Sequence, residues 1–294
     1  MATISASAVK DLREKTGAGM MDAKKALEEA GGDFEKAVDV LRQKGLSAAA
    51  KKASRVAAEG SISSTIDAQG RTGALVEVNS ETDFVAKNDE FQHFAKGISD
   101  LVAGKNPADV AALSKLELDG QGVESRRQAL VQKIGENIAV RRFVRYQTDG
   151  RLAIYLHGSR IGVMVDYQGG NDQLGKDIAM HIAAANPQFL TRDMVPSDVL
   201  ARERAVYEGQ AKESGKPPAI IPKIVEGKME KFYGDTCLLE QVYIKDPDGK
   251  LKVRDVLKQA GGGASINRFV RYQLGEGIEK KQGNFAEEVA AQLK

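Results

Sequence analysis

The first part of the chain, up to residue 55, carries three short stripes of apolar residues at helical spacing, separated by glycines. Ser7 precedes the first stripe and Asp33 the third, and both residue types accept hydrogen bonds at helix N-termini. Asp22 can begin the helix between them, and Gly45 is the expected end of the last helix. Connections this short predict a small three-helix domain over residues 1–55.

From residue 56 onward, strand-like alternation replaces the helical stripes. A charged, helix-favouring stretch at 48–53 is the expected linker helix into this region. The predicted strands are 62–66, 74–78 and 138–147 in the first part of this region, and 152–156, 161–167 and 268–273 in the second part. In each part a hairpin of two strands is followed by an amphipathic helix and later by a closing strand, so one order of elements occurs twice.

A sequence repeat supports this duplication. Residues 142–147 read RFVRYQ, and residues 268–273 repeat the same letters. We therefore predict an α+β fold with a duplicated core, made of two antiparallel-sheet and helix subdomains at 56–147 and 148–273. The paired arginines of the repeat are interpreted as structural residues of a duplicated sheet, with an RNA contact as the alternative.

The second subdomain carries an insertion at about 197–233, where polar, charged and helix-favouring residues are interrupted by SGKPP at 214–218. This pattern predicts a helical hairpin with a tight turn, and its second arm is expected to begin at or after Pro222. The hairpin is expected to be a protein-contact or dimer surface, with a solvated hairpin as the alternative. In the C-terminal module, 274–294, a short amphipathic helix is predicted from Phe285, Val289, Ala290 and Leu293.

Composition and charge exclude several functional classes. The chain has 43 basic and 41 acidic residues, a formal net charge of +2, so its overall charge gives no footprint for nucleic acid or for an anionic membrane. Cys237 is the one cysteine, which rules out an intramolecular disulfide and favours a reducing, cytoplasmic location. We find neither an amino-terminal signal sequence nor an apolar run long enough to cross a membrane.

The motifs of catalysis and nucleotide binding are poorly matched. Residues 209–216 resemble a phosphate loop, but the spacing is too long and Pro217 stands where a Ser or Thr would bind magnesium. The histidines and Cys237 are dispersed and lack metal-ligand spacing, and His181 lies on an apolar helical face, as a core histidine would. We therefore expect no enzyme, no cofactor, no metal site and no direct nucleotide binding.

Two longer segments are more informative. Residues 10–22 read KDLREKTGAGMMD, and residues 79–88 read NSETDFVAKN. Both resemble signatures of the bacterial translation elongation factor Ts family, and shorter matches occur in the family's order at 133–137, 157–163, 179–184 and 224–229. The resemblance covers nearly the whole chain. It implies a ubiquitin-associated-like three-helix head, a duplicated core, a protruding helical hairpin and a C-terminal helix, in agreement with the pattern above.

The resemblance also implies a function, which is guanine-nucleotide exchange on the GTPase elongation factor Tu. It implies that Thr82, Asp83, Phe84 and Val85 disturb the magnesium and phosphate-loop site of that GTPase, with Phe84 as a wedge between two of its helices. From the residues alone, a Phe beside a charged residue at a loop or helix start suggests a position that a partner covers. The alternative is that Phe84 packs under its own helix near Phe91.

Further contacts with elongation factor Tu are implied outside this segment, at Arg13, Met20, Met21, Lys24, Ile134, Gly135 and His157. Exposed methionines suit adaptable binding surfaces, but at least one of the two can equally be local core. Likewise, Ile134 can be core, Gly135 a helix stop and His157 a turn histidine. A homodimer within a heterotetramer stays open. The alternative function is a ubiquitin-associated-like protein-binding module with another partner.

Overall fold

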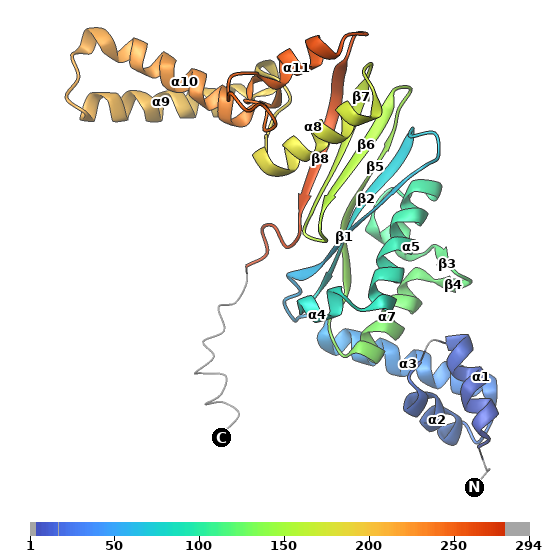
Figure 1. The fold of residues 1–294 in the computed structure, drawn as a ribbon. Helices are drawn as coiled ribbons and strands as arrows, with labels where there is room; N and C mark the ends of the chain where they lie inside the picture. The colour runs from blue at the N-terminus through green and yellow to red at the C-terminus, as the bar shows by residue number, and fades with distance from the viewer. Residues whose placement is uncertain (1–3, 17, 280–294) are drawn as a thin grey trace.

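The computed structural model describes residues 4–16 and 18–279. The molecule is elongated, with a three-helix head at one end, two small sheets in the middle and a helical hairpin at the other end (Figure 1). Helices pack on antiparallel sheets, so the predicted α+β class is confirmed. The domain boundaries predicted at residues 55, 147 and 273 stay predictions. The C-terminal helix predicted around Phe285 and Leu293 lies outside the described residues.

The head is built from three helices, α1 (Ala6–Thr16), α2 (Met20–Glu29) and α3 (Phe34–Lys52). Their apolar faces meet in one cluster that buries Leu12, Ala23, Ala26, Leu27, Ala37 and Leu41. Asp33 caps α3 as predicted, because its carboxylate accepts a 3.0 Å hydrogen bond from a backbone amide one turn on. The cap predicted for α1 is wrong, since Ser5 rather than Ser7 accepts the hydrogen bond from the Ala8 amide.

The prediction that Gly45 ends the third helix is also wrong, because α3 continues through it without a break. The stretch 48–53, expected as a separate linker helix, is therefore the last part of α3 and its cap. Gly45 packs against α7 (Val123–Ile134), where an added Cβ would lie 3.3 Å from the Gln132 side-chain oxygen and 3.7 Å from the Gln128 backbone. This glycine thus permits close packing of the head on the core.

The first unit of the core is a three-stranded antiparallel sheet with the strand order β1 (Glu59–Ile66), β2 (Thr72–Ser80) and β5 (Ala139–Gln147). Helix α5 (Asp89–Lys105) packs on the sheet, and α7 packs against both α5 and α3. The connections hold α4 (Asp83–Ala86), α6 (Val110–Ser114) and a two-stranded hairpin of β3 (Glu117–Leu118) and β4 (Gln121–Gly122).

The second unit repeats this plan with β6 (Arg151–His157), β7 (Ile161–Gln168) and β8 (Ser265–Gln273), covered by α8 (Asp172–Ala185). The insertion forms the predicted hairpin from α9 (Ser197–Glu213) and α10 (Ile221–Thr236), with Pro222 in the first turn of the second arm. Shorter helices complete the unit, namely η1 (Arg192–Met194), η2 (Pro218–Ile220), η3 (Leu238–Glu240) and α11 (Val253–Ala260).

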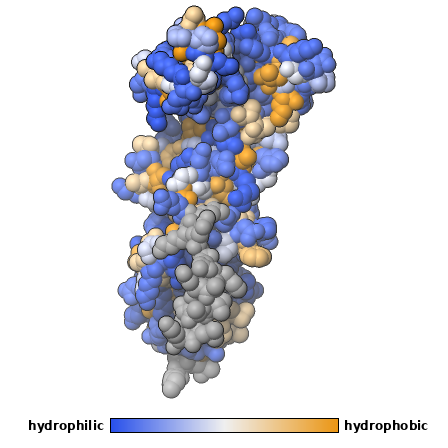
Figure 2. Space-filling model, turned by 90° about the vertical axis from the view of Figure 1, so that its left-hand side faces the viewer, coloured by the Kyte–Doolittle hydropathy of each residue, from blue (hydrophilic) through white to orange (hydrophobic). Residues whose placement is uncertain are grey.

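The helical hairpin is fixed at its base by a charged cluster. Arg192 donates hydrogen bonds to Glu230 on α10 and to the nearly buried Glu240, which Lys252 and Arg254 also contact. These hydrogen bonds, from Arg192 above all, lower the pKa of Glu240 to about 2. Figure 2 shows a mostly hydrophilic face with small apolar groups at the height of the hairpin. The role of the hairpin as a dimer or contact surface stays a prediction.

The duplication extends to single residues. Glu77 on β2 lies opposite Arg142, and Asp166 on β7 lies opposite Arg268, and in both sheets a bulge follows the acidic residue. The helices α5 and α8 both end at an asparagine in the left-handed conformation, with φ of 50° and 48°. The two units are therefore copies of one supersecondary design.

The repeated hexapeptide joins the two units. The Arg142 guanidinium lies 4.2 Å from the centre of the Tyr272 ring and donates to the Gln273 carbonyl. In the mirror arrangement, Arg268 lies 4.1 Å from the centre of the Tyr146 ring and donates to the Gln147 carbonyl. The remaining arginines of the repeat donate to carbonyl groups at the ends of α5 and α8. All of these arginines thus have structural partners inside the protein.

Candidate functional site

The segment that follows β2 protrudes from the first unit as the single-turn helix α4. Phe84 on this turn is 79% exposed, whereas Val85 is buried in the core of the first unit and Ala86 is buried beside it. The alternative, in which Phe84 packs under its own helix near Phe91, is wrong, because the Phe84 ring is exposed while Phe91 is fully buried. The structure therefore places a bare aromatic ring on a turn whose next two residues are buried.

A carboxylate from a neighbouring loop holds the start of this turn. Glu136, between α7 and β5, accepts hydrogen bonds of 3.1 Å from the Glu81 amide, 2.9 Å from the Thr82 amide and 2.6 Å from the Thr82 hydroxyl. In return the Glu81 carboxylate accepts a 2.6 Å hydrogen bond from the Asn137 amide. We call residues 81–87 the tip, and this set of hydrogen bonds the carboxylate clasp.

Asp83 forms an ion pair with Lys87 one turn later, with 3.0 Å between the carboxylate oxygen and Nζ. This hydrogen bond, together with the charges of Lys87 and Arg160, keeps the pKa of Asp83 below its usual value. The Lys87 ammonium also lies 5.8 Å from the centre of the Phe84 ring. The exposed end of the tip therefore combines one aromatic ring with one ionised carboxylate.

Three other predicted contact residues lie at the ends of core elements. Gly135, with φ of 91°, ends α7 and leads directly into the clasp residue Glu136. Ile134 is half-buried and packs on the core of the first unit, as its core interpretation predicted, and its role as a contact residue stays a prediction. His157 is exposed at the end of β6, where its Nδ1 lies 3.2 Å from the Tyr155 hydroxyl oxygen.

The predicted head contacts come from the last turn of α1 and the start of α2. Met20 and Met21 are 60% and 61% exposed, so neither methionine is part of the local core. Arg13 and Lys24 are exposed as well. In Figure 1 this end of the head lies well apart from α4. The tip and the predicted head residues thus lie on two separate projections of the molecule.

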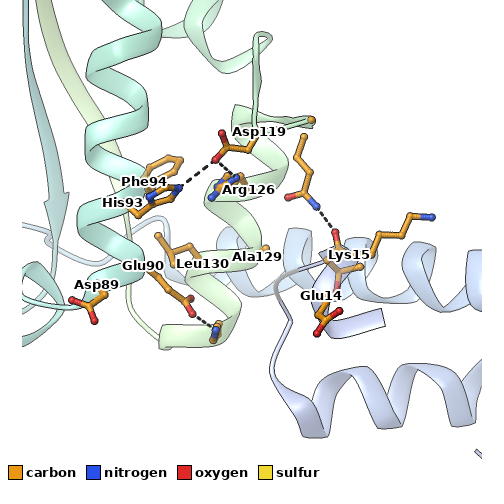
Figure 3. A pocket seen from close by; sticks show the side chains of 14 residues that line it. Glu14, Lys15, Asp89, Glu90, His93, Phe94, Asp119, Arg126, Ala129 and Leu130 are labelled. Atoms are coloured by element: carbon orange, nitrogen blue, oxygen red, sulfur yellow. Dashed lines mark hydrogen bonds and ion pairs between the residues drawn. The ribbon is translucent and has the colours of Figure 1, made fainter. Parts of the chain in front are cut away.

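A cavity of about 670 Å³ lies between the head and the core (Figure 3). Its wall holds a charged cluster in which Asp119 contacts both His93 and Arg126, and an ion pair between Glu90 and Lys133. The predicted contact residues, all of which the structure describes, lie outside this cavity. The candidate site is accordingly a set of projecting side chains rather than a pocket.

The described part of the chain contains no cluster of three or more His, Cys, Asp or Glu side chains that could hold a metal ion. Within the same residues, none of the helices has the length and apolar character needed to cross a membrane. His181 is fully buried, bonded to Gln241 and to the Ile244 amide, and its pKa is lowered by burial. It is a core histidine, as its helical position suggested.

Sequence reasoning missed two residues of the site. Lys87 could have been found, because it follows Asp83 by four positions, the spacing of an ion pair on one helical face. Glu136 gave no such signal, since its partners at Glu81 and Thr82 are distant in the sequence and are mainly backbone amides. Val85 is buried and anchors the turn, and its predicted part in the contact stays a prediction.

Comparisons with known proteins agree with this architecture. The family model described as Elongation factor TS matches residues 81–276, more than half of the chain. The protein named Elongation factor Ts from Alkalilimnicola ehrlichii is 52% identical over 292 residues, covering 99% of each chain. Its namesake from Burkholderia multivorans is 54% identical over 293 residues, covering 100% of this chain and 98% of that protein. The chain therefore belongs to the elongation factor Ts family.

Proposed function

We propose that this protein is the guanine-nucleotide exchange factor of elongation factor Tu, acting in translation elongation in the cytoplasm. The observation that carries this proposal is Phe84, a nearly bare aromatic ring on a turn that the core and the carboxylate clasp hold from below. The chain itself binds no nucleotide and no nucleic acid in this proposal. Its contribution is to bind the GTPase in a form that holds GDP poorly.

Exchange of this kind needs no covalent chemistry. A factor that binds the nucleotide-free GTPase more tightly than the GDP-bound form must weaken GDP binding by the same ratio. Each tenfold weakening requires about 1.4 kcal/mol of contact that exists only in the nucleotide-free complex. A small rigid projection suits this task, because it can occupy space that becomes available only when the nucleotide site is distorted.

The tip supplies the side chains for such a distortion. Burial of the Phe84 ring between helices of the GTPase would contribute about 1.5–3 kcal/mol. The ionised Asp83 lies beside that ring and would act near the magnesium ion, which with the phosphate-loop amides neutralises the GDP phosphates. Thr82 caps the turn and Val85 anchors it, so these two residues hold the projecting pair in place.

A second contact on the head would supply binding energy rather than distortion. Met20 and Met21 offer flexible apolar surface on α2, and the exposed Arg13 of α1 and Lys24 of α2 carry positive charge. In this proposal the ubiquitin-associated-like head docks on a helix of the same GTPase domain. Ile134, Gly135 and His157 extend the contact around the tip, and the hairpin is available for a homodimer within a heterotetramer.

The direct test is release of fluorescently labelled GDP from elongation factor Tu in a stopped-flow instrument. Loss of about 1.5–3 kcal/mol predicts that Phe84→Ala slows release by about 10- to 150-fold, with an unchanged melting temperature. A matched control is Ile66→Ala, which trims an exposed apolar side chain at the opposite end of β1. The wedge assignment fails if Phe84→Ala releases GDP as fast as the control.

A further inference from the structure

The carboxylate clasp points to a function for Glu136. We propose that Glu136 is a positioning residue for nucleotide exchange, whose carboxylate sets the orientation in which the tip presents Phe84 and Asp83. This inference rests on the proposed function of the tip. The Glu136 carboxylate accepts its hydrogen bonds from the two residues that precede Asp83 and Phe84 in the tip.

Three donors converge on Glu136 and fix the backbone conformation of the first two residues of the tip. Two of them are the amides of Glu81 and Thr82, and the third is the Thr82 hydroxyl. Hydrogen bonds to an ionised carboxylate are about twice as strong as neutral ones. Because Thr82 is the N-cap of α4, fixing this residue also fixes the direction in which the single turn starts.

Through the same loop, the clasp also ties the tip to the segment that follows the head helix α3. The Glu81 carboxylate accepts from the Asn137 amide at 2.6 Å, and the Asn137 side chain donates to the Arg55 carbonyl at 2.9 Å. On the other side of the turn, Val85 inserts into the core and Ala86 is buried. The tip is thus held at both ends, and the clasp is the polar one of the two attachments.

The second unit of the core shows what this connection looks like without a tip. There β7 passes into α8 through two glycines, Gly169 and Gly170, both with φ of 65°. An added Cβ on Gly169 would lie 2.7 Å from the Gly262 carbonyl oxygen, in the loop that precedes β8. Close backbone packing therefore occupies the place that the clasp takes in the first unit, where a projecting segment has to be supported.

A positioning role predicts a particular kinetic signature. Glu136→Ala should lower the maximal rate of GDP release at saturating factor, on the order of tenfold, because a displaced contact loses much of its effect. The concentration for half-maximal rate should change little, because the head surface is untouched. Glu136→Gln keeps one acceptor oxygen but turns an amide N–H₂ toward N–H donors, so its rate should fall between those of the unmodified chain and Glu136→Ala.

The decisive experiment is a double-mutant cycle with Phe84→Ala, measured as labelled GDP release from elongation factor Tu. If Glu136 acts through the tip, Glu136→Ala should slow release by less than about threefold once Phe84 has been truncated. Glu90→Ala is the matched control, because it removes a carboxylate that pairs with Lys133 on α7 (Figure 3) and that takes no part in the clasp. Its release rate should equal that of the unmodified chain.

The possible failures are distinguishable. An equal fold-loss from Glu136→Ala in both backgrounds, or no loss in either, overturns the positioning role while Phe84→Ala still slows release. A slow Glu136→Ala variant whose folded fraction, followed by circular dichroism at the assay temperature, has dropped in parallel also overturns it. If Phe84→Ala releases GDP at the unmodified rate, the tip itself has no part in exchange and both proposals fail.

Discussion

Two equivalent connections in the duplicated core differ sharply. In the second unit, β7 is joined to α8 by Gly169 and Gly170 alone, and Asn171 caps the helix. In the first unit, residues 81–87 stand between β2 and α5, and Asn88 caps the helix in the same manner. The strand before and the helix after are alike in both units, so the difference lies in the inserted tip.

The features that the two units share support the fold, whereas the inserted tip carries the proposed function. The bulge after the acidic residue of the strand, the paired arginine and the left-handed asparagine at the helix end occur in both units. Only the first unit adds a projecting turn with an exposed Phe84 among the residues that the structure describes at these two connections. The duplicated sheets therefore provide rigidity, and the proposed exchange activity depends on what one copy adds.

The largest predicted effect tests whether the buried carboxylates Glu77 and Asp166 stabilise their two units equally. Glu77 is fully buried and contacts both Arg141 and Arg142, whereas Asp166 contacts one arginine, Arg268. Removing one partner of a buried pair costs about 3–5 kcal/mol, and less where the other partner is in contact with solvent. Arg141 and Arg142 are about 30% exposed and Arg268 is 47% exposed, so Glu77→Ala should lower the free energy of unfolding by about 3 kcal/mol and Asp166→Ala by about 2. Urea denaturation measures both values. A larger loss for Asp166→Ala would contradict the stronger support assigned to the first unit.

The contribution of Glu77 should also depend on pH. Burial raises the pKa of Glu77, but hydrogen bonds from the Gly275 amide and from Arg141 and Arg142 outweigh it, so the pKa lies below its usual value. The stabilisation is therefore complete above the unfolded pKa of about 4.5 and is lost as the pH falls through the folded pKa. The stability difference between Glu77→Ala and the unmodified chain should shrink in acid.

The sequence predicted the duplicated sheets better than it predicted the tip. The hexapeptide repeat at 142–147 and 268–273 indicated the duplication, because identical strands require similar surroundings. It could not indicate that Arg142 stacks on Tyr272, since that contact joins strands of different units. Gly45 was misread for a related reason, because its packing partner on α7 lies far along the chain and a glycine is also the usual helix stop.

The tip shows a second limit of the sequence. Phe84 could be singled out from its polar neighbours, but its exposure depends on how the turn is held, which the residues of the tip do not specify. Glu136 determines part of that geometry through backbone amides, and an amide is present at nearly every residue. Contacts to backbone groups leave no trace in the sequence of the partner segment.

A smaller effect is predicted at the head, which tests whether binding and distortion are separate. Truncating Met20 and Met21 together to Ala removes exposed apolar surface, so the affinity for nucleotide-free elongation factor Tu should fall by about 1–3 kcal/mol, or roughly 5- to 150-fold. The maximal release rate at saturating factor should stay unchanged. A titration followed by GDP release gives both quantities, and a reduced maximal rate at saturation would show that the head takes part in the distortion.

The central claim is that the tip turns a duplicated scaffold into an exchange factor. It is tested most directly by replacing residues 81–87 with two glycines, which gives the first unit the connection found in the second. The account predicts that this chain, folded by circular dichroism and still bound to elongation factor Tu through its head, releases labelled GDP at the spontaneous rate. Release as fast as with the unmodified chain would contradict it.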